Sequence, residues 1–268
     1  MLVNCGNVNE LKIGKMVGEG LQKQTYAGKF RGVKVAVKVL YQGGRVKRCL
    51  KERIPEKMCY HYPYLTMLYD IYLNKQLQHT GITKLLGYCV RDVHNPPYKD
   101  QPLTKRGVIT VFEYGQKFTS KPKYGLLLRL QFSLQLADLL DYLAHSPIGS
   151  LQIGDLMGGN FVTVNGRLKL ADIEHSYVSE PRCRFGNFTR ACKYNLECVD
   201  GECVGYNAKE MMRVATARFF RKWLKVIDET DMEYATELEM LSSSLKNSST
   251  TAAQIRSGVK KILDKIPK

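Results

Sequence analysis

The sequence predicts an α+β fold with a strand-rich first part and a helical second part. Strand-forming residues alternate from Thr25 to Leu40, whereas apolar residues recur at helical spacing from Phe132 to Leu143. With 268 residues, 44% of them apolar, the chain can bury one full core without a further domain. We expect residues 1–114 to form a small β-rich N-lobe. Residues 115–268 would form a helical C-lobe with a cysteine-rich segment, 183–203.

The first strands enclose a glycine-containing bend. Residues 11–17 run into Gly18-Glu-Gly20, and the next strands end at Val35-Ala-Val-Lys38. Two strands joined in this way can lie over a nucleotide, with backbone N–H groups near its phosphates. Lys38 stands among apolar residues, and a buried lysine needs a partner. We expect the partners of Lys38 to be nucleotide phosphates and an acid on the next helix. The alternative is that Lys38 points outward from an alternating strand.

Three polar residues surround a predicted hairpin. Residues 161–170 form two short strand candidates around Asn165-Gly166, a dipeptide that tolerates the positive φ angles of a tight turn. Asp155 and Asn160 precede the hairpin and Asp172 follows it, so its folding would bring all three to one edge. That edge would hold an acid beside two oxygen ligands for Mg²⁺. The spacing from Asp155 to Asn160 is a weak signal alone, because both residue types are common in loops.

A second helix is predicted after the cysteine-rich segment, over residues 208–226. Its apolar residues share one face, which indicates packing rather than a cofactor site. They are Met211, Ala215, Phe219, Trp223 and Val226.

In this order, the features between Leu11 and Glu174 resemble a protein kinase. The resemblance implies a two-lobed kinase-like fold, with ATP and Mg²⁺ or Mn²⁺ as cofactors. It implies transfer of the γ-phosphate to a hydroxyl group of a protein substrate. By this resemblance, Gly18, Gly20, Lys38 and Glu113 bind the nucleotide, Lys38, Asp70 and Asp155 are catalytic, and Asn160 and Asp172 bind the metal.

A narrower resemblance rests on His145–Ser150, on the hairpin sequence and on the four-cysteine segment. These are similar to divergent extracellular tyrosine kinases of the secretory pathway. Tyrosine as the preferred acceptor, in secretory-pathway or extracellular proteins, is implied by this resemblance alone.

Several positions depart from the kinase pattern. Lys23 replaces the third glycine of the loop, and we expect it to face solvent; the alternative is a contact with a phosphate. Ile153-Gly154 replaces His-Arg, which removes the arginine that an activation-loop phosphate engages. Met157 replaces a cation near the transferred phosphate, and Glu174 replaces a glycine. The last two keep a second hypothesis open: a secreted pseudokinase that serves as a nucleotide- or protein-binding module.

Eight cysteines bear on the cellular compartment. Four of them lie within 21 residues, from Cys183 to Cys203, in a segment with few apolar residues. Zinc is an alternative to disulfides, but the segment lacks Cys-x₂-Cys and has only His175 nearby. Asn187 and Asn247 begin glycosylation acceptor triplets. We expect disulfides and an oxidising compartment.

The N-terminal residues do not form a signal peptide, because they lack a basic start and an apolar stretch. We expect a truncated piece of a secreted or secretory-lumen protein; the alternative is a cytoplasmic serine/threonine kinase with reduced cysteines. No apolar run approaches the roughly 18 residues of a membrane span. The formal charge of +16 indicates a solvated basic surface. Acidic glycans or acidic substrate segments are the alternative partners, and no nucleic-acid module is present.

Overall fold

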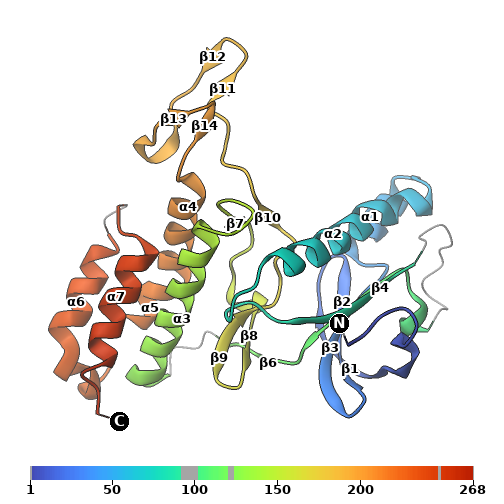
Figure 1. Cartoon of the computed structure of the whole chain (residues 1–268), viewed down its shortest axis with the longest axis horizontal. Coiled ribbons are helices and arrows are strands. Elements are labelled where there is room, and N and C mark those ends of the chain that lie inside the picture. Colours follow the sequence, from blue (N-terminus) through green and yellow to red (C-terminus); the bar gives the residue numbers. More distant parts are fainter. Residues whose placement is uncertain (1, 92–101, 120–123, 247–248, 268) are drawn as a thin grey trace. The chain divides into compact units, whose positions relative to one another are not determined.

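The structure is a computed structural model that describes residues 2–91, 102–119, 124–246 and 249–267. Asn247 therefore lies outside the described residues. The chain divides into two compact units, Met1–Gln78 with Thr83–Gln116 and His79–Ile82 with Lys117–Lys268. The first unit is built on a sheet and the second on helices (Figure 1). This arrangement confirms the predicted α+β, kinase-like class.

The first unit contains a five-stranded antiparallel sheet of order β1-β2-β3-β5-β4. Its strands are β1 (Lys12–Glu19), β2 (Lys23–Phe30), β3 (Val33–Leu40), β4 (Leu85–Val90) and β5 (Val108–Glu113). Strand β3 is central, with a strand on each edge, and its last four residues are buried on both faces. Val35, Val37 and Val39 pack on one face with Val111, while Leu40 packs on the other. Side chains alternate along a strand, so Lys38 shares the face of Leu40.

Helices α1 (Gly44–Lys51) and α2 (Glu56–Gln76) complete this unit with short 3₁₀ turns at Val8–Glu10 and Leu103–Lys105. Met67 and Ile71 of α2 pack against Leu40, which brings α2 to the face of β3 that carries Lys38. The disulfide Cys49–Cys59 joins the two helices. A second disulfide, Cys5–Cys89, fixes the N-terminal segment to β4.

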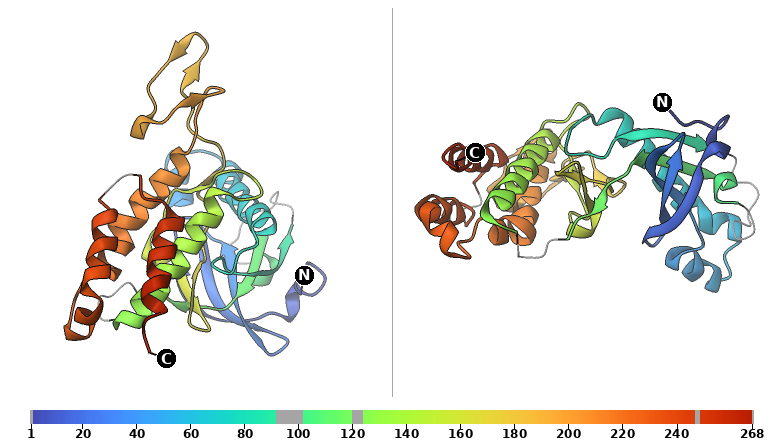
Figure 2. Two further views of the ribbon diagram at one scale, coloured as in Figure 1. Left: turned by 60° about the vertical axis from the view of Figure 1, so that its left-hand side comes forward. Right: turned by 90° about the horizontal axis from the view of Figure 1, so that it is seen from below.

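The second unit is mainly helical. Its helices are α3 (Leu126–Ala144), α4 (Tyr206–Ala215), α5 (Arg221–Trp223), α6 (Ala235–Ser244) and α7 (Ala252–Leu263), with 3₁₀ turns at Gly158–Asn160, Lys193–Asn195 and Glu229–Tyr234. Figures 1 and 2 show α3, α7 and α6 running side by side. None of the helices within the described residues is both long and apolar enough to cross a membrane.

Short strands hold the loops of this unit. They are β7 (Gln152–Ile153), β8 (Phe161–Val164), β9 (Arg167–Leu170), β10 (Ser176–Tyr177), β11 (Arg184–Phe185), β12 (Phe188–Thr189), β13 (Cys198–Val199) and β14 (Glu202–Cys203), with β6 (Gln116–Lys117) beside β8. An aromatic cluster anchors β8, because Phe161 contacts Phe219 and Phe118 edge to face. Phe118 in turn contacts Phe132 of α3 and Trp223 of α5. The strand that follows Asn160 is therefore fixed on the helical core.

The predicted helix over 208–226 is interrupted. A π-helical segment, Thr216–Phe220, lies between α4 and α5, and Val226 lies beyond α5. Four-residue steps from Met211 to Trp223 would rotate by about 40° each on a regular α-helix. The wider π turn offsets that drift, which keeps Met211, Phe219 and Trp223 all buried.

The cysteine-rich segment extends from the start of α4 as two small hairpins, β11–β12 and β13–β14 (Figures 1 and 2). Disulfides Cys183–Cys198 and Cys192–Cys203 join its parts. All eight cysteines of the chain are paired. The expectation of disulfides is confirmed, and the zinc alternative is excluded because these sulfurs are bonded to each other.

Candidate functional site

The β8–β9 hairpin forms as the Asn165-Gly166 dipeptide predicts. Both residues have positive φ angles, 49° and 75°, which match a tight hairpin turn. The register pairs Val164 with Arg167 next to the turn and Phe161 with Leu170 at the open end. Residues just outside that open end therefore lie opposite one another.

The open end of the hairpin brings together the three polar residues expected there. Asn160 Nδ2 donates to the backbone oxygen of Asp155 at 2.8 Å and to its Oδ2 atom at 3.0 Å. The N–H of Ala171, the residue before Asp172, donates to the backbone oxygen of Asn160 at 2.8 Å. Asp155 is exposed, whereas Asn160 and Asp172 are half-buried.

These residues fit a hard divalent cation. The side-chain NH₂ group of Asn160 donates to Asp155. The side-chain carbonyl oxygen of Asn160 is therefore the atom that could coordinate a cation. Asp172 adds carboxylate oxygens, and oxygen donors of this kind suit Mg²⁺ or Mn²⁺. One amide oxygen and one carboxylate, from the two ends of a hairpin, would suit a metal ion that also binds phosphate.

Lys38 in the first unit has the acidic partner expected for it. Its Nζ atom lies 3.4 Å from Asp70 Oδ2 and 4.5 Å from the centre of the Phe112 ring. Both members are buried, with 5% of Lys38 and 0% of Asp70 exposed. Asn74 Nδ2 donates to Asp70 Oδ1 at 2.9 Å and holds the carboxylate on α2. The outward orientation of Lys38 is therefore excluded.

The two loop glycines are not required by the packing of the chain itself. A Cβ atom at Gly18 or Gly20 would meet its nearest neighbour at 3.6 Å, an ordinary contact, and neither residue has a positive φ. Gly87 shows the opposite case, because a Cβ there would lie 2.1 Å from Val3 O. Close approach of a ligand to the backbone remains as a physical reason for Gly18 and Gly20.

Glu113 ends β5 and is bonded to Lys84. Its N–H donates to Lys84 O at 3.0 Å, and its Oε1 atom accepts from Lys84 N at 2.8 Å. These two contacts hold the end of β5 beside Lys84.

One expectation from the departures is wrong. Lys23 was expected to face solvent, yet only 7% of it is exposed. It lies on β2 opposite Leu40, on the face of the sheet where Met67 and Ile71 of α2 pack. Met157 is 41% exposed and Glu174 is 7% exposed. The Glu174 carboxylate lies 3.6 Å from His175 Nε2.

No protein-family model matches the chain. The chain is 27% identical over 231 residues to the human protein "Extracellular tyrosine-protein kinase PKDCC". The chain resembles a divergent PKDCC-like kinase. The match covers 81% of this chain and 44% of the human protein, so the chain spans less than half of that relative.

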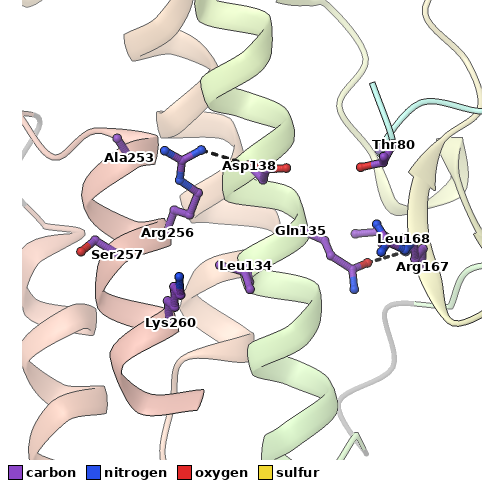
Figure 3. Close-up of a pocket in the computed structure, with 11 residues that line it drawn as sticks. Thr80, Leu134, Gln135, Asp138, Arg167, Leu168, Ala253, Arg256, Ser257 and Lys260 are labelled. Carbon is purple, nitrogen blue, oxygen red and sulfur yellow. Dashed lines mark hydrogen bonds and ion pairs between the residues drawn. The ribbon is translucent and has the colours of Figure 1, made fainter. Parts of the chain in front are cut away.

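A separate cavity lies at the turn end of the hairpin in the second unit. It has a volume of about 710 Å³ and lies among α3, α7 and β9 (Figure 3). Gln135 Oε1 accepts from Leu168 N at 2.7 Å, and Arg256 of α7 binds Asp138 of α3 at 3.0 Å. Asp155, Asn160 and Asp172 do not line this cavity. The Gln135 contact instead fixes the hairpin on α3 and so supports its open end.

Sequence reasoning missed a carboxylate that joins the cysteine-rich segment to α4. Glu210 accepts from Arg213 at 2.5 Å and from Lys193 at 3.3 Å, and the Tyr194 hydroxyl also donates to it. Lys193 and Tyr194 lie in the disulfide-bonded segment. Glu210 and Arg213 are three residues apart on a helix, and this i,i+3 spacing of opposite charges could have predicted their ion pair.

We expect Glu210 to make stability depend on acid pH. Its pKa is lowered to about 2, first because Arg213 donates hydrogen bonds to the carboxylate. A depressed folded-state pKa stabilises the protein above the ordinary value of 4.5, and that contribution is lost as the pH falls toward 2. Its size is on the order of 2 kcal/mol, because Arg213 is exposed and its charge is screened.

The measurement is urea unfolding of the wild type and Glu210→Gln at several pH values. The difference in free energy of unfolding should be largest above pH 4.5 and shrink toward acid pH. Glu239→Gln, which changes an exposed glutamate on α6, is the matched control. A difference for Glu210→Gln that stays constant across this range contradicts the assignment.

Proposed function

We propose that the chain is an ATP-dependent protein kinase that transfers the γ-phosphate to a hydroxyl group of a protein. Tyrosine is the proposed acceptor, because the human relative is named a tyrosine-protein kinase. The observation that carries the proposal is the open end of the β8–β9 hairpin. There one residue, Asn160, is bonded both to Asp155 and to the backbone next to Asp172.

Each residue has a proposed role. Gly18, Gly20 and the carbonyl of Glu113 contact the nucleotide, and Lys38, held by Asp70, orients its phosphates. Asp155 accepts the proton of the acceptor hydroxyl or positions that hydroxyl. Asn160 and Asp172 hold Mg²⁺ or Mn²⁺, which neutralises charge on the phosphates when bound.

The proposed compartment is the secretory pathway or the extracellular space. Four disulfides support it, because such bonds persist in oxidising compartments. Asn187 lies exposed in the turn between β11 and β12, where an acceptor triplet is accessible. The proposed substrates are therefore proteins of the secretory pathway or the extracellular space.

The test is a transfer assay on the purified, oxidised chain. It is incubated with γ-labelled ATP, Mg²⁺ or Mn²⁺, and a copolymer that contains tyrosine or one that contains serine. We expect metal-dependent label on the tyrosine copolymer, abolished by EDTA. Label on serine alone would contradict the tyrosine assignment, and no label on either would contradict the kinase proposal.

A pseudokinase is the second candidate, and Met157 and Glu174 favour it. Met157 supplies no cation on the loop, and the buried Glu174 places a carboxylate two residues after Asp172. A thermal shift with ATP and metal, without transfer to either copolymer, would support this candidate.

A further inference from the structure

Two cavities flank the loop from Asp155 to Gly159. The first, of about 370 Å³, is lined by Asp155, and the second, of about 520 Å³, is lined by Met157. Ala217 and Arg218 line both of them. Every lining residue belongs to the second unit, so both hollows are defined within that unit.

The four charged residues of the first cavity, Asp155, Glu210, Arg213 and Arg218, sum to zero, whereas the second cavity, with Lys117, Arg218 and Lys222, is positively charged. Arg213 in the first cavity is bound to Glu210, so those two charges offset one another. Arg218 in both cavities, and Lys117 and Lys222 in the second, form no ion pair within the described part of the chain. All three are exposed. A surface beside Asp155 therefore presents cations to a ligand.

The local backbone explains the position of Arg218. The π-helical segment Thr216–Phe220 buries Phe219 and Phe220 and leaves Ala217 and Arg218 outward. π segments inside helices are frequent at functional sites. Lys222 follows Arg218 by four residues, a spacing that puts two helical side chains on one face. Arg218 and Lys222 therefore present two cations on one face of this helical stretch.

We infer that Arg218, with Lys117 and Lys222, binds acidic side chains of the protein segment that carries the acceptor hydroxyl. The inference rests on the proposed function, because Asp155 marks the acceptor position. A peptide with Asp or Glu beside its acceptor would meet these cations while its hydroxyl meets Asp155. Such pairs of opposite charge steer and orient the peptide, and added salt weakens them because the cations are exposed.

The experiment uses two fluorescein-labelled peptides, each with one tyrosine and one serine. One has glutamates around both residues and the other has glutamines. Binding is measured by anisotropy without ATP, and transfer is measured as kcat/KM. The variants are Arg218→Gln and Lys222→Gln, with Arg184→Gln on the exposed β11 hairpin as the matched control.

We expect the wild type to prefer the glutamate peptide in both measurements. Arg218→Gln should lower the ratio of the two kcat/KM values by about twofold to fivefold, and Arg184→Gln should leave it unchanged. Preferential binding of the glutamate peptide without any transfer would support this surface while contradicting the kinase proposal.

Other outcomes would overturn the inference. Transfer with equal kcat/KM for both peptides would show that the cations do not read the acceptor segment. An equal loss on both peptides in Arg218→Gln would place this arginine at the transferred phosphate instead. Binding of a sulfated oligosaccharide, without binding of the glutamate peptide, would assign the surface to glycans.

Discussion

Replacement of Asp155 by asparagine is expected to lower phosphate transfer by about 10²–10⁴-fold, the range of a lost general base. The variant removes the carboxylate charge and the proton acceptor but keeps the shape of the side chain. Its amide oxygen can still accept from Asn160, and the 2.8 Å bond from Asn160 to the backbone oxygen of residue 155 does not depend on the side chain. We therefore expect the loop to keep its structure.

The matched control is Asp200→Asn, because Asp200 is an exposed loop aspartate with a φ of 51° that asparagine also tolerates. Initial rates on the tyrosine copolymer at saturating ATP are compared for both variants. Thermal unfolding checks that each variant is folded. Full activity of Asp155→Asn would remove the catalytic role of this residue.

The parts of the site that follow local rules could be predicted from the sequence. The Asn165-Gly166 turn fixes the hairpin register, and that register alone brings Asn160 opposite Ala171. Lys38 was predictable for a related reason, because a cation on the inner face of a central strand requires a buried acid. The two-residue repeat of a strand explains the first prediction, and the cost of removing a charge from water explains the second.

Other features depend on long-range packing, which residue spacing does not reveal. Cys5 pairs with Cys89, 84 residues away, because the N-terminal segment lies along β4. Lys23 is buried on the face of the sheet that carries Leu40, although its position in a loop motif suggested solvent. The π segment and its outward Arg218 arise from the burial of both Phe219 and Phe220.

The second large effect concerns the buried pair Lys38–Asp70. We expect Asp70→Leu to lower the free energy of unfolding by about 3–5 kcal/mol, because Lys38 is left at 5% exposure without its carboxylate. Lys38→Met with Asp70→Leu removes both charges together, and Asn74 keeps its 2.7 Å bond to the backbone oxygen of residue 70. The double variant should recover most of the loss, because apolar pairs often replace buried ion pairs at little cost.

Transfer should stay lost in the double variant, because the lysine that orients the phosphates is gone. Urea unfolding and the copolymer assay separate the two effects: stability returns and activity does not. If the double variant is as unstable as Asp70→Leu, the ion pair is required for stability. If the double variant retains transfer, Lys38 has no role in the mechanism.

Arg129–Asp231 in the second unit provides the comparison. This pair is also buried, but Arg129 donates to the carbonyl oxygens of Tyr124, Trp223 and Lys225 as well as to Asp231. Arg129→Met with Asp231→Leu would strip those carbonyls of their donor, so stability should not return there. The 3.4 Å contact of Lys38 is longer than the 2.5 Å contact of Arg129. Recovery at Lys38–Asp70, without recovery at Arg129–Asp231, would therefore indicate that the first pair is retained for a ligand and the second for the fold.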